Sequence, residues 1–439
     1  MRIAVFGAGY LGATHAACLA ELGHEVLAVD VDPAKLATLD AGEVPFYEPG
    51  LADVLRRHVA AGRLRFTSSY EQAAAFTGVY FLCVGTPQKK GEFAADLRSV
   101  DTVIDTLAPL VTGPAVIFGK STVPVGTAQR LGARARELSP AGTELEVAWN
   151  PEFLREGFAV QDTLHPDRLV LGIDRHRPGR AEAVAREVYA QLLAQDVPFL
   201  ITDLATAELV KTAANAFLAT KVSFINAISE VCEAAGADVT VLADALGYDA
   251  RIGRRFLDAG IGFGGGCLPK DIRAFMARAG ELGADQALTF LREVDTINMR
   301  RRTRMVELVR HTCGSLLGVR VAVLGAAFKP DSDDVRDSPA LNIAGQIQLQ
   351  GASVNVYDPK AMTNSRALFP TLGYAPTAAD ACQGADVVLV LTEWSEFRKL
   401  QPADLDALVR NKVLIDGRNC LHPPQWRDAG WTYHGLGRP

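Results

Sequence analysis

Apolar residues recur through the first half of the chain in short runs, and longer stretches with helical spacing lie between them. The first run, Arg2–Phe6, precedes a helical pattern over Leu11–Leu22 and a second run over Glu25–Asp30. This alternation predicts parallel strands joined by helices. The same pattern predicts strands over Val79–Val84, Ala115–Phe118, Glu146–Trp149, Leu169–Ile173 and Pro198–Ile201, and a helix over Arg180–Leu193. We therefore expect a doubly wound parallel sheet in this half.

The middle of the chain has a different pattern. It is helical without interruption from about Leu204 to Ala235, which is longer than an ordinary globular helix. Gly236 follows, and glycine is the residue that most often ends a helix. Helices are also predicted over Asp238–Leu246 and Leu288–Arg310.

The alternation of strands and helices returns near residue 319. It predicts strands over Val319–Leu324, Ser353–Tyr357, Val387–Thr392 and Val413–Asp416, and a helix over Pro339–Gln350. We therefore expect an α/β protein with two Rossmann-like doubly wound domains, joined by a central helical region that contains a long spine helix. The expected domains are residues 1–203, 204–314 and 315–439.

Composition narrows the possible functions. At 439 residues the chain is long enough for two or three domains, and its 49% hydrophobic and 22% charged residues are ordinary for a globular protein. Lys+Arg number 45 against 51 Asp+Glu, and the net charge of -6 argues against nucleic acid as a partner. The one basic concentration, Met299–Arg304, lies inside a helical pattern and is expected to form a solvated face or a subunit contact.

The seven cysteines are an odd number without paired spacing, so neither a disulfide framework nor a metal site is indicated. No apolar run approaches the roughly 20 residues that span a bilayer. We expect the N-terminal MRIAVFGAG to form a strand and a turn and not a targeting signal. We expect a reduced, cytoplasmic protein with no membrane partner.

A dinucleotide fingerprint, GAGYLG, directly follows the first strand and opens a helix. Its first glycine permits a tight turn, its second lets the backbone approach a pyrophosphate, and its third allows close packing of helix on strand. The helix N-terminus attracts phosphates. The candidate cofactor contacts in this segment are Gly7, Gly9, Tyr10, Leu11 and Gly12.

Asp30 ends the second strand at the spacing expected for a carboxylate that accepts from the adenosine ribose. It would repel a 2′-phosphate, so the sequence favours NAD over NADP, although Lys35 nearby, which is also expected to contact the cofactor, moderates the preference. The second Rossmann-like end reads VAVLGAAFKPD, where Gly325 is not followed by the other glycines. We expect no second dinucleotide to bind there in the same way.

The stretch Gly262–Asp271, GFGGGCLPKD, places Cys267 at the end of a glycine-rich loop, before a helix that Pro269 is suited to start. The helix dipole and Lys270 favour the thiolate form of Cys267, whereas the Asp271 carboxylate opposes it. Beside a dinucleotide fingerprint, such a thiol predicts an oxidation through a covalent intermediate. The alternative is that Cys267 is a small buried hydrophobic residue.

Two further segments place polar side chains four residues apart. In NPEFLREG, Asn150 can cap a helix whose Glu152 and Glu156 share one face. Paired acids are often merely solvated, but these follow a strand at the edge where such folds bind ligands. In AELVKTAANAF, Lys211 and Asn215 share a face of the long helix, and the apolar neighbours of Lys211 favour a partly desolvated amine over a surface lysine.

Two threonines also follow predicted strands. Thr122 is expected either to hold a hydroxyl or a water near the nicotinamide or to hydrogen-bond only within its loop. Thr86, in CVGTP, is expected to touch the cofactor.

Five ordered segments resemble the nucleotide-sugar dehydrogenases of the UDP-glucose/GDP-mannose dehydrogenase family. Besides the cysteine loop they are STVPVGT (Ser121–Thr127), NPEFLREG (Asn150–Gly157), AELVKTAANAF (Ala207–Phe217) and FKPDSDDVRDSP (Phe328–Pro339). The resemblance covers the whole chain, from GAGYLG to DGRN (Asp416–Asn419). It implies NAD-dependent, four-electron oxidation of a nucleotide-sugar at C6, with UDP-glucose the favoured substrate and UDP-glucuronate the product.

The resemblance also implies roles for individual residues. Lys211 would take the hydroxyl proton, directly or through a water near Thr122, and Asn215 would help to stabilise oxyanions. Cys267 would form a thiohemiacetal and then a thioester, which water would hydrolyse. The residues expected to carry the chemistry are Cys267, Lys211, Asn215, Asp271, Glu152 and Thr122, with Glu152 or a network that includes Asp271 activating the water.

The binding sets follow from the same resemblance. Further cofactor contacts are expected from Thr86, Thr122, Glu156, Lys270 and Arg336, although Arg336 also has several local ion-pair partners. Nucleotide-sugar contacts are expected from Glu152, Phe153, Leu154, Lys211, Asn215, Arg251, Phe263, Gly264, Cys267, Phe328, Lys329 and Arg418. Arg251 is expected to reach a neighbouring subunit's site, in a homo-oligomer that is a dimer or larger.

Three alternatives stay open. A relative within the family would oxidise GDP-mannose or a UDP-N-acetylhexosamine, because the cysteine loop does not separate these substrates. A non-catalytic, NAD-responsive binding protein could share the fold, but it has no need of the thiol, amine, amide and acids together. A two-electron hydroxyacid dehydrogenase has no use for the thiol or for a second nucleotide-binding end.

Overall fold

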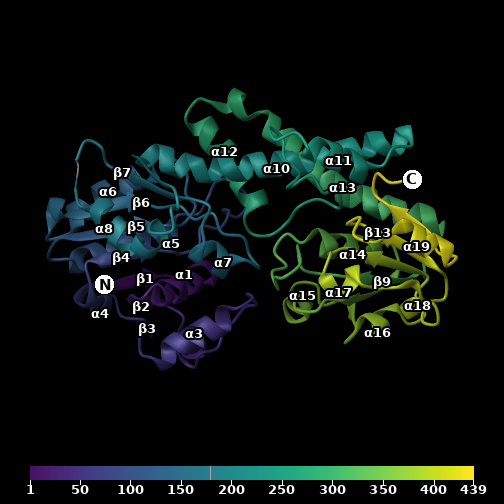
Figure 1. Ribbon diagram of the computed structural model, residues 1–439, viewed down its shortest axis with the longest axis horizontal. Coiled ribbons are helices and arrows are strands. Elements are labelled where there is room, and N and C mark those ends of the chain that lie inside the picture. The colour runs from purple at the N-terminus through teal and green to yellow at the C-terminus, as the bar shows by residue number, and fades with distance from the viewer. Residues whose placement is uncertain (178) are drawn as a thin grey trace. The chain divides into compact units, whose positions relative to one another are not determined.

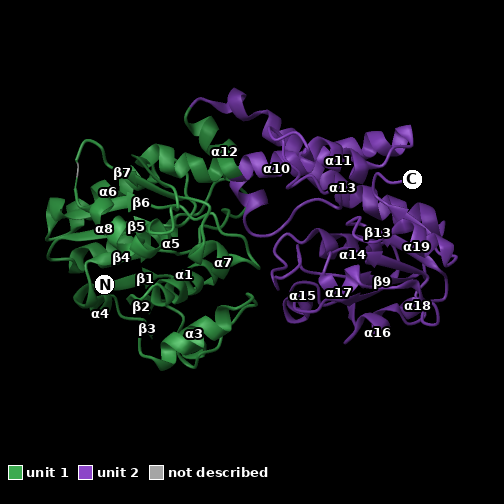
Figure 2. Cartoon of the chain, in the orientation of Figure 1, with its two compact units in different colours: residues 1–214, 273–282 green, residues 215–272, 283–439 purple. Residues whose placement is uncertain are grey.

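The computed structural model describes residues 1–177 and 179–439, and it divides into two compact units (Figure 2). Unit 1 consists of residues 1–214 and 273–282, and unit 2 of residues 215–272 and 283–439. Each unit contains its own sheet with helices packed on it (Figure 1). The expectation of an α/β chain with two Rossmann-like sheets and a long helix is confirmed.

The sheet of unit 1 has eight strands in the order β3-β2-β1-β4-β5-β6-β7-β8. They are β1 (Arg2–Phe6), β2 (Glu25–Val29), β3 (Leu64–Thr67), β4 (Val79–Leu82), β5 (Ala115–Gly119), β6 (Leu145–Trp149), β7 (Leu169–Ile173) and β8 (Phe199–Asp203). Neighbouring strands pair in parallel, except that β6 and β7 are antiparallel at one pair, Trp149 with Gly172. Their connection contains only the short helix α7 (Ala159–Leu164), not the long crossover helix typical of parallel neighbours.

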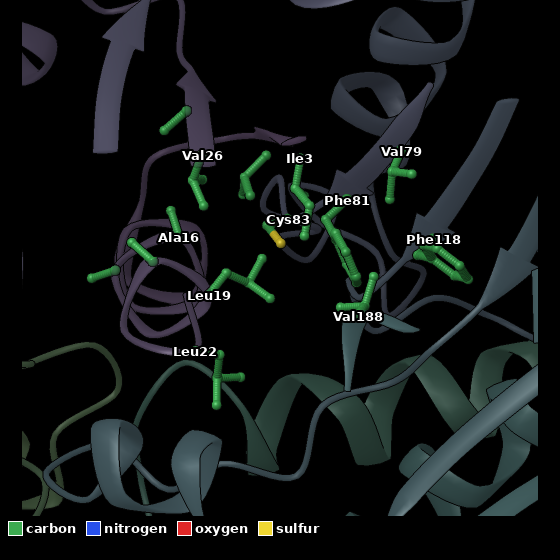
Figure 3. Close-up of a cluster of buried hydrophobic side chains, with 14 of the residues drawn as sticks. Ile3, Ala16, Leu19, Leu22, Val26, Val79, Phe81, Cys83, Phe118 and Val188 are labelled. Carbon is green, nitrogen blue, oxygen red and sulfur yellow. The ribbon is translucent and has the colours of Figure 1, made fainter. Parts of the chain in front are cut away.

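Helices cover both faces of this sheet because alternate residues of each buried strand point to opposite sides. On β1, Ile3 and Val5 pack with α1, whereas Ala4 and Phe6 pack on the other side. Figure 3 shows the cluster of buried side chains that contains Ile3, with Ala16 and Leu19 of α1 facing the sheet. One face carries α1 (Tyr10–Glu21), α3 (Leu51–Ala60), α8 (Ala181–Val188) and α9 (Ala190–Leu193), and the other α4 (Tyr70–Phe76), α5 (Arg98–Leu107) and α6 (Thr127–Leu138).

The helices of the middle of the chain follow the sequence pattern closely. The spine helix α10 spans Leu204–Ala235 as predicted, and Gly236 ends it in the left-handed region at φ 70°. It is followed by α11 (Val239–Gly247), α12 (Leu268–Glu281) and α13 (Phe290–Cys313), and unit 1 also contains the short helix α2 (Pro33–Asp40). Among the helices of the described residues, none is long and apolar enough to cross a membrane.

The basic run on α13 is not a solvated face throughout. Arg301 and Arg302 are 1% and 2% exposed. Arg301 donates from Nε to the Gly260 carbonyl oxygen at 3.0 Å, and Arg302 pairs with Asp337 at 2.8 Å. The prediction is therefore wrong for these two residues, because acceptors distant in the sequence satisfy their guanidinium groups inside the unit.

The sheet of unit 2 has six parallel strands in the order β11-β10-β9-β12-β13-β14. They are β9 (Arg320–Leu324), β10 (Ser353–Tyr357), β11 (Gly373–Tyr374), β12 (Val387–Val390), β13 (Val413–Asp416) and β14 (Thr432–Gly435). Its helices are α14 (Pro339–Leu349), α15 (Met362–Leu368), α16 (Ala378–Cys382), α17 (Ser395–Arg398), α18 (Pro402–Leu405) and α19 (Pro423–Asp428). The edge strands β3, β11 and β14 were not predicted, because they are short and lack a continuous apolar run.

Candidate functional site

The fingerprint loop between β1 and α1 leaves room for a dinucleotide. Gly7 adopts φ +92°, which a side chain would strain, and it donates to the Val29 carbonyl oxygen at 2.8 Å. A Cβ at Gly12 would clash with the Gly7 carbonyl, so only glycine permits this approach of α1. A Cβ at Gly9 would meet nothing within 4 Å, so the backbone there faces open space. These features fit a loop that holds a pyrophosphate at a helix N-terminus.

Asp30 lies at the carboxyl end of β2, next to this loop. Its carboxylate accepts from the Ala8 amide at 2.7 Å, from the Asp32 amide at 3.0 Å and from Lys35 Nζ at 2.9 Å. Burial alone would raise the pKa of the Asp30 carboxyl, but the hydrogen bonds from Lys35, Ala8 and Asp32 outweigh it and hold the pKa below its ordinary value. The position therefore carries a negative charge, as an adenosine ribose site for NAD requires.

Tyr10 of the fingerprint is tied to the acid-bearing loop through Glu48, a residue that sequence reasoning missed. The Tyr10 hydroxyl donates to Glu48, whose carboxylate also accepts from the amides of Gly157 at 2.6 Å and Ala159 at 2.7 Å. Burial raises the pKa of the Tyr10 hydroxyl, and the nearby Glu48 and the buried Glu156 raise it further. The only sign of this contact in the sequence is that PFYEPG, just before α3, contains an acid.

The threonines that follow β4 and β5 lie together. Thr86 Oγ1 donates to the Thr122 carbonyl oxygen at 2.7 Å, and Thr86 is 7% exposed. Thr122 is half-buried. The structure therefore links the two strand-end loops in which cofactor contacts were expected.

The segment after β6 is not a helix, and this part of the prediction is wrong. Residues 151–158 form an irregular loop, so Glu152 and Glu156 do not share a helical face. Asn150 cannot cap a helix because its side chain is buried and donates to the Val170 carbonyl oxygen at 2.7 Å. Gly157 has φ +82°, and the Glu152 carboxylate accepts from the Leu154 amide at 2.8 Å, which favours a turn.

Glu152 nonetheless meets the expected amine. Lys211 Nζ lies 2.9 Å from Glu152 Oε1, and the two side chains are only 6% and 12% exposed. Lys211 Nζ also lies 5.8 Å from the centre of the Phe153 ring. The Cζ atom of Arg168 lies 3.9 Å from the same ring centre. Lys211 is thus desolvated, as expected, and it has an acid partner that the spacing alone did not identify.

A second buried acid, Glu208, lies one helical turn before Lys211 on α10. Its carboxylate accepts from the amides of Gly126 at 2.7 Å and Ala128 at 2.6 Å, at the start of α6. Burial raises the pKa of the Glu208 carboxyl to about 7, although these amides and the nearby Arg278 oppose the shift. Glu208 therefore attaches the loop that carries Thr122 to the helix that carries Lys211.

In unit 2, Cys267 immediately precedes α12. It is the only exposed cysteine of the seven, all of which are described, so it is not a buried hydrophobic residue. Asp271, 1% exposed, accepts from Lys270 Nζ and from Asn215 Nδ2, each at 2.6 Å. The amine, amide and carboxylate expected around the thiol's helix therefore form one hydrogen-bonded group.

The glycine-rich loop before the thiol is held from two sides. Asn298 of α13 accepts from the Phe263 amide at 2.7 Å and donates to the Phe263 carbonyl oxygen at 3.0 Å. A Cβ at Gly264 would clash with the Asp337 carbonyl, and one at Gly265 would lie 2.8 Å from the Phe328 ring. The glycines therefore let this loop lie against the segment that follows β9.

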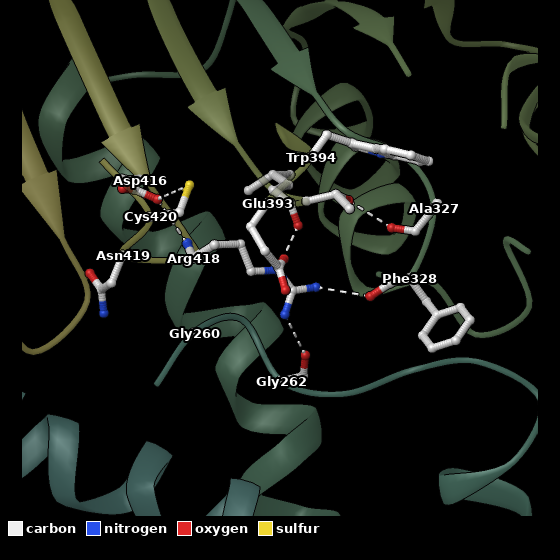
Figure 4. Close-up of polar contacts among 12 residues, drawn as sticks. Gly260, Gly262, Ala327, Phe328, Glu393, Trp394, Asp416, Arg418, Asn419 and Cys420 are labelled. Atoms are coloured by element: carbon white, nitrogen blue, oxygen red, sulfur yellow. Dashed lines mark hydrogen bonds and ion pairs between the residues drawn. The ribbon is translucent and has the colours of Figure 1, made fainter. Parts of the chain in front are cut away.

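Arg418 connects the same loop to the carboxyl edge of the sheet, as Figure 4 shows. It donates to the carbonyl oxygens of Leu391 at 2.8 Å, Gly262 at 3.2 Å and Phe328 at 3.1 Å, and it lies 3.3 Å from the Glu393 carboxylate. The expected phosphate-binding cation is thus part of the scaffold of the cysteine loop.

The remaining cations differ in their surroundings. Lys329 Nζ lies 5.5 Å from the centre of the Phe328 ring. Arg336 pairs with Asp334 at 2.7 Å, as its local partners suggested, and a Cβ at Gly266 would clash with its guanidinium group. Arg251 is exposed and pairs with Asp249 at 2.6 Å. Within the described residues, no group of three or more His, Cys, Asp or Glu side chains could hold a metal ion.

The comparisons with known proteins cover the whole chain. Residues 1–193, 205–300 and 322–423 match the NAD binding domain, the central domain and the UDP binding domain of the UDP-glucose/GDP-mannose dehydrogenase family. The chain is 40% identical to the UDP-glucose 6-dehydrogenase of Rhizobium meliloti (strain 1021), covering 100% of both. It is similar to a solved UDP-glucose dehydrogenase from Pyrobaculum islandicum, with a TM-score of 0.91 and 37% identity over 100% of this chain and 98% of the other. A UDP-D-ManNAc dehydrogenase from Pyrococcus horikoshii has a TM-score of 0.87 and 26% identity over 100% and 99%.

We predict that Asp30→Ser raises the KM for NAD about tenfold or more and weakens the preference over NADP, because the ribose loses an acceptor and the Ala8 amide loses its partner. Steady-state kinetics with both cofactors measure this. Lys35→Met is the control, since it keeps the carboxylate and should keep the selectivity for NAD. An unchanged KM for NAD in Asp30→Ser would show that the carboxylate does not contact the cofactor.

Glu208 predicts an unusual dependence of stability on pH. Because its pKa is raised from 4.5 to about 7, the folded state binds a proton that the unfolded state has lost in this window. Relative to Glu208→Gln, the wild type should lose up to about 3 kcal/mol of unfolding free energy as the pH rises from 4.5 to 7. Urea denaturation of both proteins at several pH values measures the difference, and a constant difference would contradict the assignment.

Proposed function

Because this chain belongs to the UDP-glucose/GDP-mannose dehydrogenase family, we propose that it oxidises the C6 hydroxyl of UDP-glucose to a carboxylate, using two NAD per turnover. The proposal depends mainly on one observation. The single exposed cysteine lies at the start of α12, beside the hydrogen-bonded group of Lys270, Asp271 and Asn215. The full-length identity of 40% to a UDP-glucose enzyme, against 26% to a UDP-D-ManNAc enzyme, supports the choice of sugar.

In the first oxidation a hydride leaves C6 and the hydroxyl proton passes to a base. The fingerprint loop and Asp30 would hold NAD, which would supply the hydride acceptor for each oxidation. Lys211 takes the proton directly or through a water held by Thr122, and the Glu152 carboxylate at 2.9 Å stabilises the ammonium that forms. The product of this step is the C6 aldehyde.

The second oxidation proceeds on the thiol. The Cys267 thiolate adds to the aldehyde carbon, and Lys211 and Asn215 stabilise the resulting oxyanion. Loss of the second hydride from C6 leaves a thioester. Water activated by Glu152, or through Asp271, then breaks the C–S bond and releases the carboxylate and the thiol.

Most of the binding roles are assigned to residues of one unit for each ligand. In unit 1, Thr86, Glu156 and the fingerprint residues would contact NAD. In unit 2, Phe263, Phe328, Lys329 and Arg418 would contact the nucleotide-sugar, since their loops pack on one another. Phe153 and Leu154 are assigned to the sugar, and Lys270 and Arg336 to the cofactor.

The organisation of the protein is proposed on the same basis. We assign NAD binding to residues 1–203, the cysteine loop to residues 204–314 and nucleotide-sugar binding to residues 315–439. The protein would act in the cytoplasm as a homo-oligomer in which Arg251, exposed here, reaches a neighbouring subunit's site.

We predict that limiting UDP-glucose yields two NADH per sugar, because the thioester route removes four electrons. Absorbance of NADH at completion measures the ratio, with GDP-mannose and UDP-N-acetylglucosamine compared under the same conditions. One NADH per sugar would exclude the thioester route, and activity only with another sugar would overturn the substrate assignment.

We further predict that Cys267→Ser abolishes formation of UDP-glucuronate, since the hydroxyl is a much weaker nucleophile than the thiolate. Binding of NAD and UDP-glucose should persist, which calorimetric titration of the variant measures. Cys313→Ser is a matched control at a half-buried cysteine outside the loop and should keep full activity. Turnover near the wild-type rate in Cys267→Ser would contradict the covalent mechanism.

A further inference from the structure

Lys120 and Asn150 are the first residues after β5 and β6, which are neighbouring strands in the sheet of unit 1. Strands β5 and β6 pair in parallel with Gly119 opposite Trp149, so the next residue of each strand lies at the same level of the carboxyl edge. The Asn150 amide donates to the Gly119 carbonyl oxygen at 2.8 Å, which extends the ladder by one bond. Each of the two residues therefore begins a loop at a fixed point of the sheet.

Their side chains form a closed hydrogen-bonded group with Tyr189, which lies between α8 and α9. Asn150 Oδ1 accepts from Lys120 Nζ at 2.9 Å and from the Tyr189 hydroxyl at 2.6 Å. Lys120 Nζ also lies 3.5 Å from the Tyr189 oxygen, and Asn150 Nδ2 donates to the Val170 carbonyl oxygen at 2.7 Å. Both ends of the Asn150 amide are thus fixed, and the side chain cannot turn without breaking a buried bond.

The lysine of this group is buried among an amide, a phenol hydroxyl and aromatic rings. It is 6% exposed, and Glu152, the acid whose charge acts on it, is ion-paired with Lys211. The rings of Phe81 and Tyr189 have their centres 6.0 and 5.9 Å from Nζ. Burial lowers the pKa of the Lys120 amine to about 8, against the influence of Cys83 and Glu152. Burying an amine costs free energy, which its hydrogen bonds to Asn150 and Tyr189 offset.

The two loops that start at Lys120 and Asn150 carry the residues assigned to proton transfer. Thr122 follows Lys120 by two positions, and Glu152 follows Asn150 by two positions. Residues 151–158 have no helix or strand of their own, so side-chain contacts hold the loop, among them that of Glu48 with the Gly157 amide and those of Asn150 where the loop begins. Asn150 lies just before this loop, two residues before Glu152. The ion pair of Glu152 with Lys211 depends on the position of the loop.

We propose that Lys120, Asn150 and Tyr189 form a buried anchor that fixes the loop of Thr122 relative to the loop of Glu152, and that Lys120 is a positioning residue for the oxidation. The inference rests on the proposed function, because the relative position of the two loops affects turnover only if their residues take part in the oxidation. A small displacement of either loop would separate the groups that handle the proton and would slow chemistry more than binding.

The test compares Lys120→Met and Tyr189→Phe with the wild-type protein. Lys120→Met keeps the length of the side chain and removes the amine, whereas Tyr189→Phe removes only the hydroxyl. We expect Lys120→Met to lower kcat about tenfold or more while both KM values change less than about threefold, and Tyr189→Phe to have the same pattern with a smaller loss. Tyr80→Phe is the matched control, because it removes another buried hydroxyl of the same sheet, bonded to the Thr77 carbonyl oxygen at 2.5 Å. It should leave kcat unchanged.

Hydrogen exchange gives a readout that does not depend on activity. In Lys120→Met and in Tyr189→Phe, amides of residues 121–127 and 151–158 should both exchange faster, and in Tyr80→Phe neither segment should change. A wild-type kcat in both variants, or faster exchange in only one of these two segments, would overturn the anchor. If Lys120→Met does not fold, Tyr189→Phe decides the question alone. If the wild type does not oxidise UDP-glucose, the proposed function fails, and the exchange measurement still decides whether the anchor exists.

Discussion

The parallel register of the central strands is the constraint on which the rest of unit 1 depends. One row of paired residues crosses the sheet, from Val29 through Phe6, Leu82 and Gly119 to Trp149. The residues that follow this row are Asp30, Gly7, Cys83, Lys120 and Asn150, so segments far apart in the sequence leave the sheet at one level. Since parallel strands present their carboxyl ends at the same edge, the fingerprint, Asp30 and the loops that carry Thr122 and Glu152 all start there.

Buried carboxylates then hold these loops in place. Glu48 accepts from amides at the start of α7, and Glu208 from amides at the start of α6. A negative charge at a helix N-terminus is favourable because it meets unsatisfied N–H groups and the positive end of the helix dipole. The partners are 111 residues apart in the sequence for Glu48 and Ala159 and 80 apart for Glu208 and Ala128. Each acid therefore attaches an irregular segment to a helix, which gives the loops positions that their own backbone would not define.

The two sheets use an acid after their second strand in different ways. Asp30 accepts from the Ala8 amide and Lys35, and it is 9% exposed at a loop whose glycines leave open space. Asp358, at the equivalent place after β10, accepts from the amides of Ala326 and Ala327 and from the Trp394 indole, and it is 1% exposed. Because its acceptor positions are occupied by the protein, Asp358 braces the loop after β9 and is not available to a ribose. The acid after the second strand thus lies beside open space in one unit and is enclosed by protein donors in the other.

The sequence by itself determined all the strands except β3, β11 and β14, and it determined the spine helix and the dinucleotide loop, because hydrophobic period and glycine geometry are local properties. It also identified Cys267, Lys211 and Asp30 from residue type and position along an element. The tertiary structure decided what lies opposite them. NPEFLREG is a loop and not a helix because Asn150 bonds to a neighbouring strand, and Arg301 is buried because a distant carbonyl oxygen accepts from it. Such partners are separated by tens to more than a hundred residues, and no local pattern specifies which buried donor will meet which acceptor.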